Sequence, residues 1–169
     1  CQLCQLVTSG YDAVKAIYPQ AKVIVHIDEG NNPNRYIWLF DGLKADGGKW
    51  DVIGMSLYPD PETQDWRKLN NDCISNIKNL IERYNTPVMM CELGINWNYE
   101  EAEAFFTDFV TKAKEIDQCL AYSPGSLSAT VVGKGITKVY LTTAASRLLH
   151  LMPSNDKFMN PFHNFTPNP

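Results

Sequence analysis

Three apolar segments of this chain end in side chains that could do chemistry. KVIVHID carries His26 and Asp28 at its end, WDVIGMSLYP carries Ser56 and Tyr58, and TPVMMCELGINW carries Glu92 behind an apolar run. Each of these side chains can donate or accept a hydrogen bond or ionise. A carboxylate held on a rigid strand can act as a nucleophile, so Glu92 is the candidate catalytic residue. The alternative, from the pattern alone, is a strand-end carboxylate that caps the next helix or pairs with a lysine.

The elements around these residues alternate between helix and strand. Short apolar runs predict strands at residues 22–27, 51–57 and 87–92. Apolar side chains at helical spacing predict four helices, at residues 9–19, 34–47, 65–84 and 98–118. Apolar strands separated by amphipathic helices are typical of the α/β class, in which helices cover a parallel sheet.

Two sheet architectures share this order of elements. A doubly wound sheet that binds nucleotides is expected to carry a glycine-rich turn, and the chain has neither G-x-G-x-x-G nor a P-loop. A (β/α)8 TIM barrel carries its chemistry at the carboxyl ends of its strands, where this chain becomes polar. We therefore predict a partial (β/α)8 barrel with Asp28, Tyr58 and Glu92 at one edge of three adjacent parallel strands.

The composition of the chain argues against several classes of function. With 169 residues, 44% of them hydrophobic, the chain suits one globular domain, and its net charge of -4 argues against a nucleic-acid partner. No apolar run approaches the roughly 20 residues of a membrane span, and no leader is recognisable. The lone C-x-x-C at Cys1 and Cys4 lacks the further ligands of a zinc site. We predict no metal site and expect the other cysteines to behave as small apolar residues: Cys73, Cys91 and Cys119.

The segments AKVIVHIDEG, RYIWLFDGL, WDVIGMSLYP and TPVMMCELGINW resemble, in order and spacing, the second half of the arabinogalactan endo-β-1,4-galactanases of glycoside hydrolase family 53. The resemblance covers residues 9–120. It implies strands 5 to 7 of a retaining glycosidase barrel, in which the strand-7 glutamate, here Glu92, is the nucleophile. It also implies that His26, Asp28 and Tyr58 line the substrate cleft, with Tyr58 close enough to orient Glu92 by a hydrogen bond.

Trp97 lies close to Glu92 in the sequence and is a candidate platform for a sugar ring, because sugar C–H groups stack on the face of tryptophan. Each candidate also has a structural interpretation. His26 could be a core histidine, Asp28 could cap the following loop, Tyr58 could form only a wall of the cleft, and Trp97 could pack against the next helix. The remaining tryptophans are assigned to the core: Trp38, Trp50 and Trp66.

The resemblance implies a substrate and a cellular setting. The substrate would be galactan or arabinogalactan in the side chains of pectin. The full-length enzyme would be a monomer in an extracellular, periplasmic or cell-surface location. No cofactor is implied, and calcium binding by a full-length member is left open.

One expected motif is missing from the chain. The family's acid/base glutamate lies in a G-N-E type motif at the end of the fourth strand, and no such motif occurs here. We therefore expect a fragment that lacks the first four strands and is inactive in isolation. The alternative is a non-catalytic carbohydrate-binding remnant or pseudoenzyme.

Residues 121–169 do not continue the resemblance and show no clear period. A reading frame that starts one base earlier permits G-V-F-S-W-E-P-E from codons compatible with residues 121–128, which resembles the eighth strand of the family. We therefore divide the chain into a barrel portion, residues 1–120, and a frame-shifted tail, residues 121–169. Residues 134–143 are expected to form a lone strand with nowhere to pair.

Overall fold

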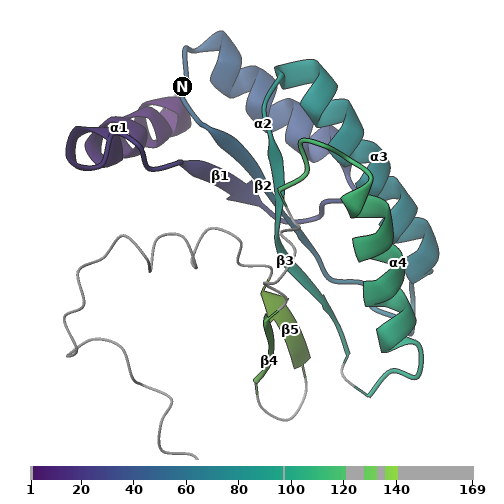
Figure 1. Ribbon diagram of the computed structural model, residues 1–169. Coiled ribbons are helices and arrows are strands. Elements are labelled where there is room, and N and C mark those ends of the chain that lie inside the picture. The colour runs from purple at the N-terminus through teal and green to yellow at the C-terminus, as the bar shows by residue number, and fades with distance from the viewer. Residues whose placement is uncertain (1, 97, 121–127, 133–135, 141–169) are drawn as a thin grey trace, which may run out of the picture.

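The computed structural model describes residues 2–96, 98–120, 128–132 and 136–140 (Figure 1). A helix comes first and three strand–helix pairs and a short hairpin follow. The helices are α1 (Gln2–Ile17), α2 (Pro33–Ala45), α3 (Trp66–Tyr84) and α4 (Ala102–Lys114). The strands are β1 (Ile24–Ile27), β2 (Val52–Leu57), β3 (Val88–Ile95), β4 (Ser128–Val132) and β5 (Ile136–Tyr140).

The strands form one sheet in the order β1-β2-β3-β5-β4. β1, β2 and β3 are parallel neighbours, and α2, α3 and α4 lie together on one side of them (Figure 1). Each crossover helix therefore returns the chain to the start of the adjacent strand. The predicted α/β class with adjacent parallel strands is confirmed.

Both ends of α3 are defined by capping residues. Asp65 caps α3, because its side chain accepts hydrogen bonds from the backbone N–H groups of Arg67 and Lys68. Asn85 ends the same helix in the left-handed conformation, with φ of 48°. The expectation that a helix begins at Asn98 is wrong. A turn in which the Ala102 N–H binds the Tyr99 carbonyl comes first, so α4 begins only at Ala102.

The hydrophobic core lies between these helices and the sheet. Every residue of β2 is buried, and large side chains of α2 and α4 fill the layer above it. The largest buried aromatic side chains are Tyr36, Phe40, Phe105 and Phe109. Parallel sheets need such cover because their strands are apolar along their whole length.

The tryptophans do not all belong to this core. Trp66 is buried and Trp50 is half-buried, with its ring 5.3 Å from the ring of Phe40. Trp38 is 74% exposed, so its assignment to the core is wrong. On a helix with about 3.6 residues per turn, Trp38 lies opposite the buried positions of α2, which Tyr36 and Phe40 represent.

The cysteines are free thiols in the part of the chain that the structure describes. Cys4, Cys73 and Cys119 are buried and Cys91 is half-buried. Cys1 lies outside the described residues. No helix of the described residues is long and apolar enough to cross a membrane.

The hairpin of β4 and β5 pairs with the sheet. β5 runs antiparallel to β3, with Leu93 opposite Val139 and Ile95 opposite Thr137. The expectation that residues 134–143 have nowhere to pair is therefore wrong for Ile136–Tyr140. A free strand edge presents unpaired N–H and C=O groups, and these can accept a further strand in either direction. The frame-shifted origin of residues 121–169 stays a prediction, and most of that segment lies outside the described residues.

Candidate active site

A β-bulge sets the direction of Glu92. Met55 pairs with Met90, but the next residue of β2, Ser56, pairs with Glu92, so β3 carries one extra residue, Cys91, at this point. A bulge interrupts the alternation of side chains between the two faces of a strand. Two consecutive residues, Cys91 and Glu92, can therefore point to the same face. Bulges are frequent beside active sites because they re-aim a side chain in this way.

Gly54 shows which side chains share that face. A Cβ atom placed on Gly54 would lie 2.8 Å from each of three atoms: Cys91 Sγ, His26 Cβ and Ile24 Cγ2. Side chains of β1 and β3 thus meet over the backbone of β2, where a larger residue would collide with them. His26 and Cys91 therefore lie on one face of the sheet, and the absence of a side chain at Gly54 makes that packing feasible.

The two candidates with the closest contact are Tyr58 and Glu92. The Tyr58 hydroxyl donates a hydrogen bond to Glu92 Oε2 at 2.5 Å. Tyr58 lies just after β2 and is 41% exposed, while Glu92 is half-buried on β3. This hydrogen bond engages one of the two carboxylate oxygens of Glu92. The role of Glu92 as a nucleophile stays a prediction.

His26 is joined to β2 by a second short contact. Its Nε2 atom lies 2.5 Å from Ser56 Oγ. Ser56 is 3% exposed, whereas the His26 ring is exposed, so His26 is not a core histidine. Our sequence reasoning noted Ser56 as a polar strand end but left it out of the candidate site. Its position two residues before Tyr58, on the same face of the strand, is the signal that could have included it.

Asp28 forms an ion pair with a residue of the neighbouring helix α2. Arg35, in the first turns of α2, binds Asp28 Oδ1 at 3.0 Å and Glu29 Oε2 at 2.9 Å. Asn32 donates a further hydrogen bond to Glu29, whose φ of 54° is unusual for a residue other than glycine. The hydrogen bonds from Asn32 and Arg35 lower the pKa of Glu29. Asp28 thus braces the loop after β1, and its role in substrate binding stays a prediction.

Cys91 is the other potential nucleophile near Glu92. Burial raises the pKa of the Cys91 thiol, and the negative charge of Glu92 raises it further. The reactive form of cysteine is the thiolate, which is scarce at neutral pH when the pKa is raised. The raised pKa therefore disfavours Cys91 as a nucleophile. Trp97, the predicted sugar platform, lies outside the described residues.

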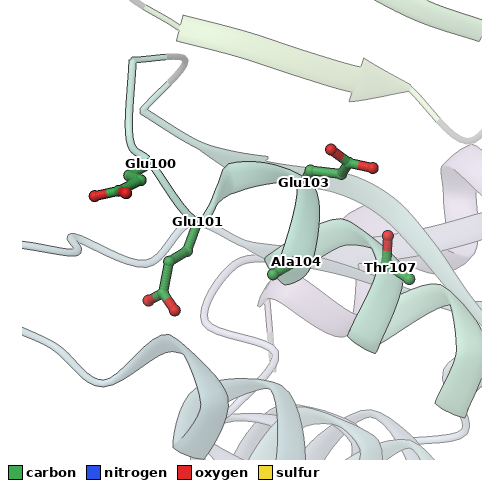
Figure 2. A pocket seen from close by; sticks show the side chains of 5 residues that line it. All are labelled: Glu100, Glu101, Glu103, Ala104 and Thr107. Atoms are coloured by element: carbon green, nitrogen blue, oxygen red, sulfur yellow. The ribbon is translucent and has the colours of Figure 1, made fainter.

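A separate hollow lies beside the loop between β3 and α4. It is lined by Glu100, Glu101, Glu103, Ala104 and Thr107 (Figure 2). Figure 2 shows the three carboxylates pointing in different directions, so they do not converge on a common point. Across the described ranges, no group of three or more His, Cys, Asp or Glu side chains could hold a metal ion. The hollow does not include Glu92, so we place the candidate chemistry at the sheet edge.

The fold and this edge together define a class of protein. Parallel strands whose crossover helices lie on one side form part of a TIM-like barrel, and the glutamate–tyrosine pair lies at the carboxyl ends of these strands. Residues 1–139 match the family described as Glycosyl hydrolase family 53. The chain belongs to glycoside hydrolase family 53. The match extends beyond residue 120, where we judged the resemblance to end.

Individual relatives cover the chain in part. A protein of Niallia circulans described as "Uncharacterized protein in bgaB 5'region" is 31% identical over 99 residues, which are 58% of this chain and 25% of that protein. The Ignisphaera aggregans GH53 catalytic domain is 23% identical and has a TM-score of 0.48, and the match covers 70% of this chain and 32% of that one. The GH10 xylanase from Bispora sp. MEY-1, solved with xylobiose, is 15% identical and has a TM-score of 0.53. That match covers 82% of this chain and 45% of the xylanase, and it supports the barrel fold.

Proposed function

We propose that this chain is the part of a retaining β-1,4-galactanase that carries the nucleophile, Glu92. The family supports a glycosidase that acts on polysaccharide, and we infer galactan or arabinogalactan side chains of pectin as the substrate. One observation carries the proposal within the site. Glu92 accepts a hydrogen bond from Tyr58 at 2.5 Å, on the carboxyl-end edge where barrel enzymes do their chemistry.

The reaction follows from the two oxygens of Glu92. Its free oxygen attacks the anomeric carbon, and a bond from Glu92 to that carbon forms as the glycosidic C–O bond breaks. The leaving oxygen takes a proton from a second carboxyl group about 5 Å away. Water then hydrolyses the glycosyl-enzyme, so the configuration at the anomeric carbon is retained. We assign orientation of the Glu92 carboxylate to Tyr58.

The neighbouring candidates bind the substrate in this proposal. The exposed ring of His26, fixed by Ser56, offers a ring nitrogen to sugar hydroxyl groups. Asp28 lies at the same edge, and Trp97 would stack against a sugar ring. The second carboxyl group would come from outside this chain, because the G-N-E type motif is absent from its sequence.

The isolated chain should therefore show no measurable turnover. Loss of the general acid alone removes a factor of about 10²–10⁴, and loss of half of the barrel removes most of the substrate positioning. The alternative function is a non-catalytic carbohydrate-binding remnant. An in-frame G-N-E segment upstream in the gene would favour the enzyme. We further propose that the full-length protein is a monomer outside the cytoplasm or at the cell surface.

The test uses an enzyme in which the first four strands and a parallel eighth strand have been restored. We expect endo-cleavage of β-1,4-galactan with retention of the anomeric configuration. Proton NMR would identify the anomer that forms first. Glu92→Gln should abolish cleavage, because the amide cannot form the glycosyl ester. The matched control is Glu82→Gln, an exposed position on α3, which should leave the rate unchanged. Near-normal cleavage by the Glu92→Gln enzyme would overturn the assignment.

A further inference from the structure

Helix α2 carries a tryptophan on its outer face. Trp38 is 74% exposed, although tryptophan side chains are highly buried on average in folded proteins. In the part of the chain that the structure describes, Trp38 is the one large apolar side chain of α2, α3 and α4 that is strongly exposed. Most of the surface of its ring is therefore accessible from outside the molecule.

A complete barrel leaves this face of α2 open. In a (β/α)8 barrel each helix packs on the sheet and lies between two neighbouring helices, and α2 lies between α1 and α3 (Figure 1). The Cys4 thiol of α1 contacts the carbonyl oxygen of Asp46, just after α2, at 3.4 Å. On the other side, Arg83 of α3 binds Asp41 of α2. The remaining strands and helices of a barrel would lie beyond α1, so the exposure of Trp38 does not depend on them.

The surface next to Trp38 is open along the helix. Gly42 lies four residues further on and so is on the same side of α2. A Cβ atom placed on Gly42 would have no atom within 4 Å. Ala45, which is exposed, continues this side with a second small residue. A flat ligand could thus lie against the ring of Trp38 without colliding with the next turn of the helix.

A fixed pair of charged side chains lies beside the ring. Asp41 is three residues after Trp38, so the two side chains are neighbours on the helix surface. Arg83 donates hydrogen bonds from Nε to Asp41 Oδ1 at 3.1 Å and from Nη2 to Asp41 Oδ2 at 2.5 Å. The Tyr84 hydroxyl also donates to Asp41 Oδ1, at 2.8 Å. These bonds hold both groups in place, yet the side chains of Arg83 and Asp41 stay 44% and 42% exposed.

This combination suits a neutral sugar. The C–H groups of a sugar ring stack on the face of tryptophan. Its hydroxyl groups can donate to a carboxylate and accept from a guanidinium, and the opposite charges of Asp41 and Arg83 cancel, so an ionic ligand gains little.

A protein partner would need a larger apolar surface. A stable interface buries about 800 Å² on each side, whereas one aromatic side chain supplies about 150–250 Å². Among the described residues, α2 exposes no second large apolar side chain that could extend the surface around Trp38. The area therefore fits one or two sugar rings better than a protein.

We propose that Trp38 and the Asp41–Arg83 pair form a second carbohydrate-binding site, outside the candidate active site, that binds a β-1,4-galactan chain. The choice of galactan rests on the proposed function. Trp38 lies about 8 Å along the helix axis from Pro33, where α2 begins after the loop that follows β1. A polysaccharide held at Trp38 stays close to the candidate active site, which raises its effective concentration there.

Affinity electrophoresis of this chain in gels that contain β-1,4-galactan tests the site. We expect galactan to retard the chain, and Trp38→Ala to weaken the affinity about tenfold because the stacking surface is lost. Trp38→Tyr should recover most of the affinity, since tyrosine keeps an aromatic face. Tyr18→Ala is the matched control: Tyr18 is 66% exposed but lies after α1, and this change should leave the affinity unaltered.

A second measurement uses the restored enzyme. Trp38→Ala should raise KM for long galactan several-fold more than KM for a short galacto-oligosaccharide, because only a long chain can reach both sites. Arg83→Gln should have the same effect to a smaller degree, since it removes the charged donor and leaves the ring.

Four results would overturn the proposal: no retardation by galactan, equal retardation of Trp38→Ala and the parent, an equal loss in Tyr18→Ala, or self-association of the chain through Trp38 in analytical ultracentrifugation. The proposed function fails separately. Galactan binding that depends on Trp38, in a restored enzyme that cleaves no galactan, would support the second site and contradict the galactanase assignment. Galactan cleavage without binding at Trp38 would do the reverse.

Discussion

Glu92 accepts a hydrogen bond of 2.5 Å from Tyr58, and the hydroxyl group is the only part of the tyrosine side chain that makes this bond. Tyr58→Phe removes the hydroxyl and leaves the ring. In the restored enzyme we expect kcat for galactan to fall roughly tenfold with KM little changed, since a hydrogen bond to a charged group contributes about 1.5–3 kcal/mol and this one is partly exposed. Steady-state kinetics would check it. Tyr18→Phe changes another exposed tyrosine, and an equal loss there would show that the effect is not specific.

Glu101 is the most strongly shifted carboxylate of the described residues that is not in the candidate site. Hydrogen bonds from Arg67 and, at 3.1 Å each, from Trp66 Nε1 and the Tyr99 hydroxyl lower the pKa of Glu101 to about 2. A carboxyl pKa that is lower in the folded state stabilises the protein above the unfolded pKa, about 4.5. That stability is lost as the pH falls from about 4.5 towards 2.

This shift predicts how Glu101→Gln depends on pH. The variant should have a lower free energy of unfolding than the parent at pH 7, and the difference should shrink as the pH falls below about 4.5. Urea unfolding at several pH values would measure it. Glu103→Gln, at an exposed position in the first turn of α4, should show no such convergence. A constant difference between Glu101→Gln and the parent would contradict the prediction.

The sequence indicated where these residues would gather but not how each would be held. Tyr58 and Glu92 were predicted to meet because the carboxyl ends of parallel strands share an edge. The bulge at Cys91 could not be read from the sequence, since it depends on the register between two strands. Nor could the partner of Asp28, because Arg35 reaches it only after the loop has folded.

At the scale of elements, β2 depends on the absence of a side chain at Gly54. Gly54→Ala would place a methyl group 2.8 Å from atoms of Ile24, His26 and Cys91. Overpacking of this kind costs roughly 1–3 kcal/mol of folding stability. Chemical denaturation would measure the loss.

Gly42 provides the opposite control. It lies inside α2, and a Cβ atom there would have no neighbour within 4 Å. Gly42→Ala should raise the free energy of unfolding by up to about 1 kcal/mol, because alanine favours the helix more than glycine does. If Gly54→Ala were also neutral or stabilising, the close packing of β1 and β3 over β2 would be wrong.

The sequence predicted which helices and strands form better than it predicted where each of them begins and ends. All three parallel strands and four helices lie near their expected positions, because apolar periodicity marks the buried faces. α1 begins at Gln2, not at residue 9, since its first turns present their apolar side chains outward and so gave no core-facing signal. The pairing of β5 with β3 was missed because a free edge can accept a strand from a segment far away in the sequence.

At the scale of the whole molecule, the strand direction in the sheet reverses beyond β3. β1, β2 and β3 are parallel, whereas β5 runs antiparallel to β3 and so cannot stand for the next parallel strand of a barrel. We propose that residues 121–169 are read in a shifted frame. If the intended frame starts one base earlier, the first two bases of each codon as written become the last two bases of an intended codon. The codons of residues 121–128 then permit G-V-F-S-W-E-P-E, an apolar strand that ends in tryptophan and glutamate.

The coding sequence provides the test of this last prediction. Read one base earlier after Leu120, it should stay open through the family-like strand and reach a stop near Ser154 and Asn155. With the upstream half restored, the corrected frame should give an active enzyme, because the new strand can pair parallel to β3 and close the barrel, while the tail as written occupies that edge in the wrong direction. Early stop codons in the shifted frame, or full galactan cleavage by the restored enzyme that keeps the tail as written, would show that residues 121–169 belong to the native protein.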